Sequence, residues 1–221
     1  MSGTPGRPLS SELSEQLLSV AVDILAEEGW SRLNSDRIAA RARAGKAGIY
    51  RRWPTMAALV HHAVGRFTLV PTPEGGGSLR EDLISLAARW SRPLDREERA
   101  VASIVGAARY EDELCAALDD AVVRPLAAAV DELGRRSEER GEPIEPGRLS
   151  LLGSVLQAFW WQRYMAGPNG VMTPGQLEQV VDDVLVPIAA AAPETAPGTA
   201  PGTAPATAPG TATTRSEPAR V

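Results

Sequence analysis

Residues 34–59 read NSDRIAARARAGKAGIYRRWPTMAAL, and this stretch decides the fold of the chain. It contains two short helical patterns separated by a tight break, with basic residues concentrated on the second. In the first pattern Ile38 and Ala42 are spaced to face a core, and in the second Ile49 and Trp53 form one apolar face. The stretch therefore predicts a helix-turn-helix, the arrangement with which a short helix enters the major groove of DNA.

The side chains left free by these apolar faces are the candidate DNA contacts. Asn34 can accept a hydrogen bond at the start of the first helix, and Thr55 can do the same for the helix that follows Pro54. Side chains on the open face of the second helix can meet phosphates and base edges. The predicted DNA-binding residues are Asn34, Arg43, Gly45, Lys46, Ala47, Gly48, Tyr50, Arg51, Arg52 and Thr55.

The local charge supports this prediction. Between Ser35 and Arg66 seven basic residues accompany one acid, so the segment carries +6 in a chain whose formal net charge is -5. An acidic protein with one basic face can bind a polyanion, because counterion release depends on the charges in contact. The alternative interpretation is a solvated helix face, since runs of basic residues are common on exposed helices.

The quoted stretch resembles the DNA-binding domain of the TetR family of transcriptional regulators. The landmarks of this resemblance are Ile38, Ala39, Ala42, Tyr50, Arg51 and Trp53. The resemblance implies that Lys46 and Tyr50 hold phosphates, and that Arg51 and Arg52 contact the DNA backbone or guanine. It also implies an all-α fold, with an N-terminal three-helix helix-turn-helix domain and a C-terminal helical domain for ligand binding and dimerisation.

Three positions depart from the family pattern. Arg43 stands in the turn where glycine is usual, so either the turn is strained by roughly 1 kcal/mol or the break lies nearer Gly45. Gly48 replaces a threonine and costs about 1 kcal/mol of helix propensity relative to alanine. Met56 replaces a lysine that would contact a phosphate. These differences bear on DNA affinity more than on the fold.

The composition allows a sizeable core and argues against several classes of protein. The chain has 221 residues, 43% of them hydrophobic, and no uninterrupted apolar stretch of the roughly 18 residues that a membrane span needs. We therefore expect a cytoplasmic protein without a membrane partner. The single Cys115 excludes an intramolecular disulfide, and His61 and His62, expected on the surface, make no metal-ligand cluster.

No arrangement of side chains predicts catalysis. Nucleophile, base and phosphate-loop motifs are missing from the sequence, so no catalytic residue, metal or cofactor is predicted. The carboxylate pairs at 27–28, 97–98 and 182–183 read as exposed helix charges.

Helical periodicity continues through the rest of the chain. The predicted domains are a flexible arm at 1–10, the helix-turn-helix domain with its connecting helix at 11–67, a helical domain at 78–191 and a disordered Thr-Ala-Pro-Gly tail at 192–221. A flexible link is expected at 71–77. Helix ends are predicted at Gly29 and Gly141. Capping boxes are predicted at Ser78/Glu81 and Thr173/Gln176. The prolines predict a break near Pro125 and a disturbed last turn at Pro187.

An aromatic cluster at 159–164 is the second feature that can carry function. Consecutive rings point in different directions on a helix, so some can line a cavity while others pack in an interface. The predicted ligand-pocket residues are Trp90, Arg109, Tyr110, Gln157, Phe159, Trp160, Arg163 and Tyr164. From the pairing of the last helices that the resemblance implies, the predicted dimer-interface residues are Leu152, Leu156, Trp161, Leu177, Val181, Val184, Leu185 and Ile188. The alternative is that the rings belong only to the core and the interface.

Together these features predict a sequence-specific DNA-binding transcriptional regulator. In this hypothesis it is a homodimeric repressor, released from a near-palindromic operator by an unidentified small-molecule effector. A dimer would place its two recognition helices about 34 to 36 Å apart. The first alternative is a helical ligand-binding protein or enzyme that keeps the scaffold but has lost DNA binding. The second, a purely structural dimer, leaves the basic stretch unexplained.

Overall fold

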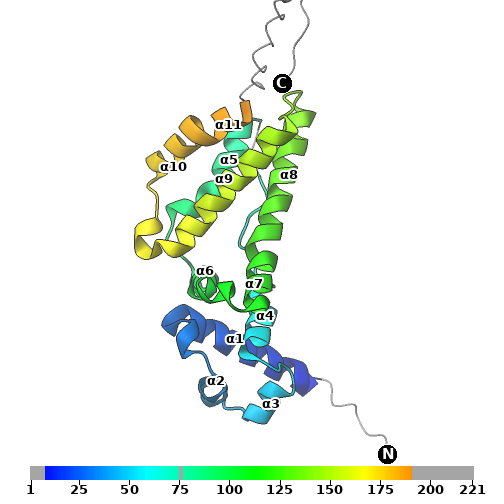
Figure 1. The fold of residues 1–221 in the computed structure, drawn as a ribbon, viewed down its shortest axis with the longest axis vertical. Coiled ribbons are helices and arrows are strands. Elements are labelled where there is room, and N and C mark those ends of the chain that lie inside the picture. The colour runs from blue at the N-terminus through cyan, green and yellow to red at the C-terminus, as the bar shows by residue number, and fades with distance from the viewer. Residues whose placement is uncertain (1–7, 75–76, 191–221) are drawn as a thin grey trace, which may run out of the picture. The chain divides into compact units, whose positions relative to one another are not determined.

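The N-terminal helices follow the order that the sequence predicts (Figure 1). The computed structural model of the protein describes residues 8–74 and 77–190. The first helices are α1 (Pro8–Glu28), α2 (Ser35–Ala42), α3 (Lys46–Tyr50) and α4 (Met56–Val64), with a 3-10 turn at Trp30–Arg32. Helix α1 begins three residues earlier than predicted, and it ends at Gly29, whose φ of 85° favours glycine.

The remaining helices complete an all-α fold. They are α5 (Leu79–Ala87), α6 (Arg96–Ile104), α7 (Asp112–Leu118), α8 (Arg124–Glu139), α9 (Pro146–Met165), α10 (Pro174–Val180) and α11 (Val186–Ala190). Short 3-10 turns lie at Ala88–Ser91, Ala107–Arg109 and Gly167–Gly170. No strand occurs within residues 8–74 and 77–190, and none of the helices described there is both long and apolar enough to cross a membrane.

Two π turns mark the predicted helix disturbances. The turn at Asp119–Val123 joins α7 to α8 two residues before Pro125, and the turn at Val181–Leu185 joins α10 to α11 two residues before Pro187. A proline lacks the N–H that continues the ladder, and its ring clashes with the carbonyl four residues earlier. Widening the preceding turn to a π turn avoids this conflict, so both helices continue through their prolines.

The helix caps confirm some predictions and correct others. Thr173 and Gln176 form the predicted capping box, and Gly141, with a φ of 79°, ends α8 as expected. The predicted box at Ser78 forms only in part, because Ser78 accepts from the Glu81 amide while the Glu81 carboxylate accepts from Gly77 instead.

The interpretation of Glu98 as an exposed helix charge was wrong. Its side chain is buried and completes a capping box with Asp95 at the start of α6. The signal was available in the sequence, since an Asp followed three residues later by Glu is a capping-box pattern.

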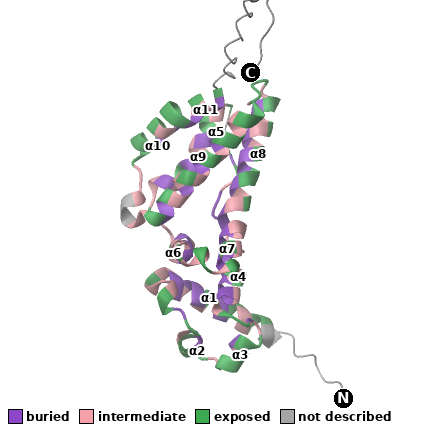
Figure 2. Cartoon of the chain, viewed as in Figure 1, coloured by how far each residue is buried: buried purple, intermediate pink, exposed green. Residues whose placement is uncertain are grey.

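The core joins the two predicted halves of the chain. Helix α1 packs against α6, and α4 packs against α7, so the described residues belong to one compact unit. The Arg96 side chain at the start of α6 donates to Asp23 of α1 at 2.6 Å. Figure 2 shows buried residues beside exposed ones on each helix, as expected for amphipathic helices around a shared core.

The expected flexible link is partly packed. Pro73 is buried, and its carbonyl lies 3.5 Å from a guanidinium nitrogen of Arg136 on α8. The predicted tail at 192–221 and most of the predicted arm lie outside the described residues.

Candidate nucleic-acid interface

The turn between α2 and α3 is built around Arg43 in a left-handed conformation. Its φ is 50° and its ψ is 43°, and no other non-glycine residue in the described ranges has a positive φ. The Ala44 amide donates to the Ala39 carbonyl at 2.9 Å and the Arg43 amide to Ala40 at 3.3 Å, which is a Schellman motif. Of the two possibilities left open by the sequence, the strained turn is therefore correct. Gly45 has an ordinary extended conformation and precedes α3 without a side-chain cap.

Helix α3 is short and is held by two buried side chains. Ile49 is completely buried and Trp53, just beyond the helix, is 5% exposed. The Trp53 amide also donates to the Ile49 carbonyl at 2.9 Å, which continues the helical path past Tyr50. The predicted apolar face of this helix is thus confirmed.

The opposite side of the turn and of α3 is open to solvent. The predicted contacts Asn34, Arg43, Gly45, Lys46, Ala47, Tyr50, Arg51 and Thr55 are exposed, whereas Gly48 and Arg52 are half-buried. Asn34 and Thr55 cap their helices, accepting from the Arg37 amide at 3.0 Å and the Ala58 amide at 2.9 Å. Eight of the ten predicted residues are therefore accessible to solvent, while Ile49 and Trp53 anchor the segment that carries most of them.

Intramolecular ion pairs reduce the local charge excess. Four of the seven basic residues between 35 and 66 are paired: Arg37 with Glu28, Arg41 with Glu27 and Glu28, Lys46 with Asp36, and Arg66 with Glu15. Counting these four acids lowers the excess from six positive charges to three. The side chains of Arg43 and Arg51 have no hydrogen-bond or ion-pair partner within the part of the chain that the structure describes.

Arg52 and Tyr50 make contacts that sequence reasoning did not anticipate. The Arg52 guanidinium donates to Ser14 Oγ of α1 and to the Gly48 carbonyl, both at 2.8 Å. The Tyr50 hydroxyl donates to Ser35 Oγ at 3.1 Å while half of the residue stays exposed. Arg52 thus ties α3 to α1, whereas Tyr50 keeps an accessible ring beside the start of α2.

The connection from α3 to α4 contains a further contact that the sequence did not indicate. Trp53 Nε1 donates to His62 Nδ1 of α4 at 3.1 Å, and the two rings meet edge to face with centroids 5.8 Å apart. A separation of nine residues across a turn corresponds to no regular helical spacing, so no local pattern could have paired them.

The aromatic residues predicted to line a pocket pack against one another. Trp90 stacks on Phe159 with centroids 5.0 Å apart and meets Trp160 edge to face at 6.4 Å. Trp90, Trp160 and Tyr164 are almost completely buried. Two indole N–H groups and the Tyr164 hydroxyl are buried without a partner within the described residues.

Arg163, predicted as a polar pocket contact, belongs to a buried ion pair. Its guanidinium lies 3.0 Å from a Glu98 carboxylate oxygen and donates to the Arg92 carbonyl at 2.9 Å. Burial, with a further contribution from the Glu98 charge, raises the pKa of the Tyr164 hydroxyl well above its ordinary value. The Tyr164 hydroxyl therefore remains neutral at physiological pH.

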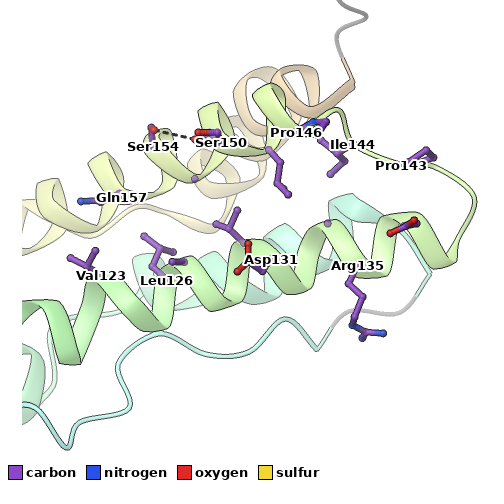
Figure 3. Close-up of a pocket in the computed structure, with 16 residues that line it drawn as sticks. Val123, Leu126, Asp131, Arg135, Pro143, Ile144, Pro146, Ser150, Ser154 and Gln157 are labelled. Atoms are coloured by element: carbon purple, nitrogen blue, oxygen red, sulfur yellow. Dashed lines mark hydrogen bonds between the residues drawn. The ribbon is translucent and has the colours of Figure 1, made fainter.

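A cavity of about 830 Å³ lies elsewhere, between α8 and α9 (Figure 3). Leu126 and Asp131 point into it from α8, and Ile144 enters from the connecting loop. Of the predicted pocket residues only Gln157 lines this cavity, while Arg109 and Tyr110 are exposed on the connection between α6 and α7. The predicted set is therefore not assembled around the cavity.

Most residues predicted for the dimer interface are buried inside the protomer. Leu152, Leu156, Leu177, Val181 and Leu185 lie in the core, whereas Trp161 and Ile188 are half-buried and Val184 is 37% exposed. The apolar period of a helix does not distinguish a stripe that faces its own core from one that faces a partner. An exposed apolar stripe does occur on α9, where Leu151, Ala158 and Met165 follow one another at seven-residue steps.

The chain is similar to known regulators over most of its length. Two family models match it: bacterial regulatory proteins, tetR family, over residues 17–63, and tetracyclin repressor-like, C-terminal domain, over residues 73–184. An uncharacterized HTH-type transcriptional regulator of Mycobacterium tuberculosis is 30% identical over 173 residues, which cover 78% of this chain and 85% of that protein.

Two further similarities agree with these matches. The DNA-binding transcriptional repressor TetR of Mycobacteroides abscessus is 29% identical over 176 residues, covering 78% of this chain and 92% of that protein. In structure, a protein of Mesorhizobium loti assigned to the TetR-family transcriptional regulators superimposes with a TM-score of 0.59 at 18% identity, covering 81% of this chain and 96% of that one. That structural match supports the fold alone.

Proposed function

This chain belongs to the TetR family of bacterial transcriptional regulators, and we propose that it is a repressor released from its operator by a small molecule. The observation that supports its DNA-binding part is the short helix α3, anchored by Ile49 and Trp53 while Lys46, Tyr50 and Arg51 stay exposed. As a DNA-binding protein it would act where the chromosome lies, in the cytoplasm. Membership of a regulator family also separates it from enzymes.

The proposed DNA contacts divide by chemistry. Arg43 and Arg51 have guanidinium groups without a partner among the described residues, and these suit phosphates or guanine, whereas Lys46 must leave Asp36 to reach a phosphate. The other exposed members of the set named from the sequence surround these cations. Arg52 is half-buried in its bonds to Ser14 and Gly48, and we propose that it positions α3.

The test is selection of duplexes from a random library, followed by binding measurements at several salt concentrations. A regulator should enrich a near-palindrome and bind it at least about a thousandfold more tightly than an unselected duplex. Arg51→Ala should reduce this preference, and Arg99→Ala, on an exposed part of α6, is the matched control. Binding without enrichment of a sequence, or no binding, would favour the alternative of a ligand-binding protein that has lost its DNA role.

We place the dimer contact on the exposed apolar stripe of α9. Leu151 is 45% exposed and Met165 is 76% exposed, and large apolar side chains in a row on one helix face are typical of interaction surfaces. Of the predicted interface residues, Trp161, Val184 and Ile188 also remain at least partly accessible. Leu151→Asp should convert a dimer to a monomer in sedimentation experiments, whereas Gln179→Asp on the exposed side of α10 should not.

We place the effector in the cavity between α8 and α9. Its volume of about 830 Å³ lies within the usual range of roughly 300 to 1,000 Å³ for small-molecule sites. Apolar walls from Leu126 and Val130 combine with polar groups of Asp131 and Gln157, which would orient a ligand with one polar end. A screen for molecules that release the selected duplex tests this placement, with Gly153→Leu filling the cavity as the discriminating variant.

A further inference from the structure

Both histidines of the chain lie side by side on α4, and each is bonded to a different neighbour. His62 Nδ1 accepts from Trp53 Nε1 at 3.1 Å, just beyond the recognition helix α3. His61 Nε2 lies 2.8 Å from Asp120 Oδ2 in the π turn between α7 and α8. Figure 1 shows α4 beside α7, which the π turn continues. Helix α4 therefore links the DNA-reading helix to the helix that continues into the α8–α9 cavity.

The hydrogen bond from Trp53 is compatible only with a neutral His62 ring. An indole nitrogen is a donor only, so His62 Nδ1 must carry no proton in this arrangement. A protonated imidazole has two donors and no acceptor, so charging His62 removes the partner of the Trp53 N–H. Trp53 is only 5% exposed, so its indole is packed against the protein on nearly all sides, and water can reach it only from the surface cavity that it lines. Charging His62 thus deprives the Trp53 N–H of its protein acceptor just beyond the end of α3.

The contact of His61 responds to protonation in the opposite direction. A charged His61 would form an ion pair with the Asp120 carboxylate in place of a neutral hydrogen bond, and charge-assisted bonds are stronger. A β-carbon added to Gly65 would lie 3.2 Å from the same carboxylate, so the end of α4 approaches Asp120 closely. Acidification therefore tightens α4 on the π turn while it loosens α4 from α3.

The charged groups around this pair come from several elements. Arg66, two residues beyond the end of α4, lines the same surface cavity as His62 and is held by both carboxylate oxygens of Glu15 of α1, at 2.9 and 3.0 Å. Asp120 is also paired with Arg124 of α8, which in turn contacts Asp119 at 2.9 Å. Glu113 of α7 lies 3.5 Å from the Thr55 hydroxyl at the start of α4. A surface cavity of about 390 Å³ brings solvent to both rings; its lining is Trp53, Ala58, His61, His62, Gly65, Arg66 and Asp120.

We propose that these two contacts form a proton-operated latch, in which charging of His62 releases Trp53 and lowers DNA affinity. Histidine is the side chain whose charge most readily changes near physiological pH, so acidification is the perturbation that tests the latch. The DNA consequence rests on the function proposed above, whereas the release of Trp53 does not. Two added positive charges would by themselves strengthen attraction to DNA. A fall in affinity would therefore identify the lost contact as its cause.

The first experiment follows the indole N–H signals of the full chain by NMR between about pH 7.5 and about pH 5.5. The Trp53 signal, assigned by its loss in Trp53→Phe, should move with pH as the hydrogen bond breaks. In His62→Gln it should stay constant, because an amide oxygen can accept from Trp53 and carries no charge. His61→Gln is the matched control and should leave the movement intact. A Trp53 signal that does not respond, or that responds equally in His62→Gln, overturns the latch.

The second experiment measures affinity for the selected duplex over the same pH range at constant ionic strength. The unmodified protein should lose about fivefold in affinity per protomer, the ratio that one net hydrogen bond represents, and His62→Gln should lose less than about twofold. If no duplex is selected, the proposed function fails while the indole titration still decides the latch. If the indole signal moves but affinity does not fall, the link between the latch and DNA is wrong.

Discussion

Replacement of Arg43 by glycine should stabilise the protein and weaken its binding to DNA at the same time. The residue has a φ of 50°, and its backbone amide is part of the Schellman motif that ends α2. Glycine makes the same backbone hydrogen bonds without the strain that a β-carbon imposes in this region. The Arg43 side chain is exposed and has no partner among the described residues. Its removal therefore takes away no stabilising contact that would offset the relief of strain.

The magnitude follows from two opposing contributions. An L-residue in the left-handed region costs roughly 1 to 2 kcal/mol, and glycine adds about 0.5 to 1 kcal/mol of backbone entropy to the unfolded state. Arg43→Gly should therefore raise the free energy of unfolding by about 0.5 to 1 kcal/mol, or the Tm by roughly 2 °C for a domain of this size. If Arg43 meets a phosphate, the slope of log affinity against log salt should become shallower by about 0.9 per protomer.

The assay combines thermal unfolding with salt-dependent fluorescence anisotropy on the selected duplex. Two further variants separate backbone from charge. Arg43→Asn relieves the strain without restoring a charge, so it should behave like Arg43→Gly. Arg43→Lys keeps both the strain and the charge, so its stability and salt slope should remain close to those of the unmodified protein. An Arg43→Gly protein that is less stable than the original, or whose salt slope is unchanged, would refute the reasoning.

Three other predictions concern charge. Lys46→Ala should make the salt slope shallower by about 1 per protomer in the same anisotropy assay, and an unchanged slope would remove Lys46 from the phosphate contacts. Glu98→Gln should cost about 3 to 5 kcal/mol in urea unfolding because buried Arg163 loses its counter-charge. Adding Arg163→Met should recover most of that loss, and a double variant as unstable as the single one would contradict this account. Two backbone amides at the start of α9 hold the pKa of the Glu145 carboxyl below its ordinary value. The stability that this cap adds is therefore fully present above the ordinary pKa and is lost as the pH falls through the lowered one. Glu145→Gln should therefore narrow the difference in unfolding free energy between about pH 6 and about pH 3.5, and an unchanged difference would count against the cap.

Local sequence patterns were sufficient for the fold and for the anchor of the candidate site. The burial of Ile38, Ile49 and Trp53 follows from their spacing, because a short helix must turn its apolar stripe to the core. Pro125 and Pro187 predicted the disturbed turns, because the N–H that proline lacks would bond within the same helix. For the turn, the sequence showed a conflict at Arg43 but could not say whether the chain would accept strain or shift its break.

Long-range pairing explains what could not be predicted. Glu28 lies 13 residues from Arg41 and Ser14 lies 38 residues from Arg52, and no periodicity connects such positions. The charge count of the stretch therefore exaggerated its free positive charge. The aromatic cluster near Trp160 was predicted as either pocket wall or core, and only packing could decide between these roles.

The π turn before Pro125 fixes the rotational phase between α7 and α8. A π turn accommodates about one residue more than an α-helical turn, which corresponds to about 100° of rotation. Asp120 lies inside this widened turn, and Val123 at its end lines the α8–α9 cavity. If the turn became an ordinary α-helical turn, the Asp120 carboxylate would rotate about the helix axis, away from His61. Pro125 thus helps to set the rotation of α8 relative to α7, the helix that packs against α4.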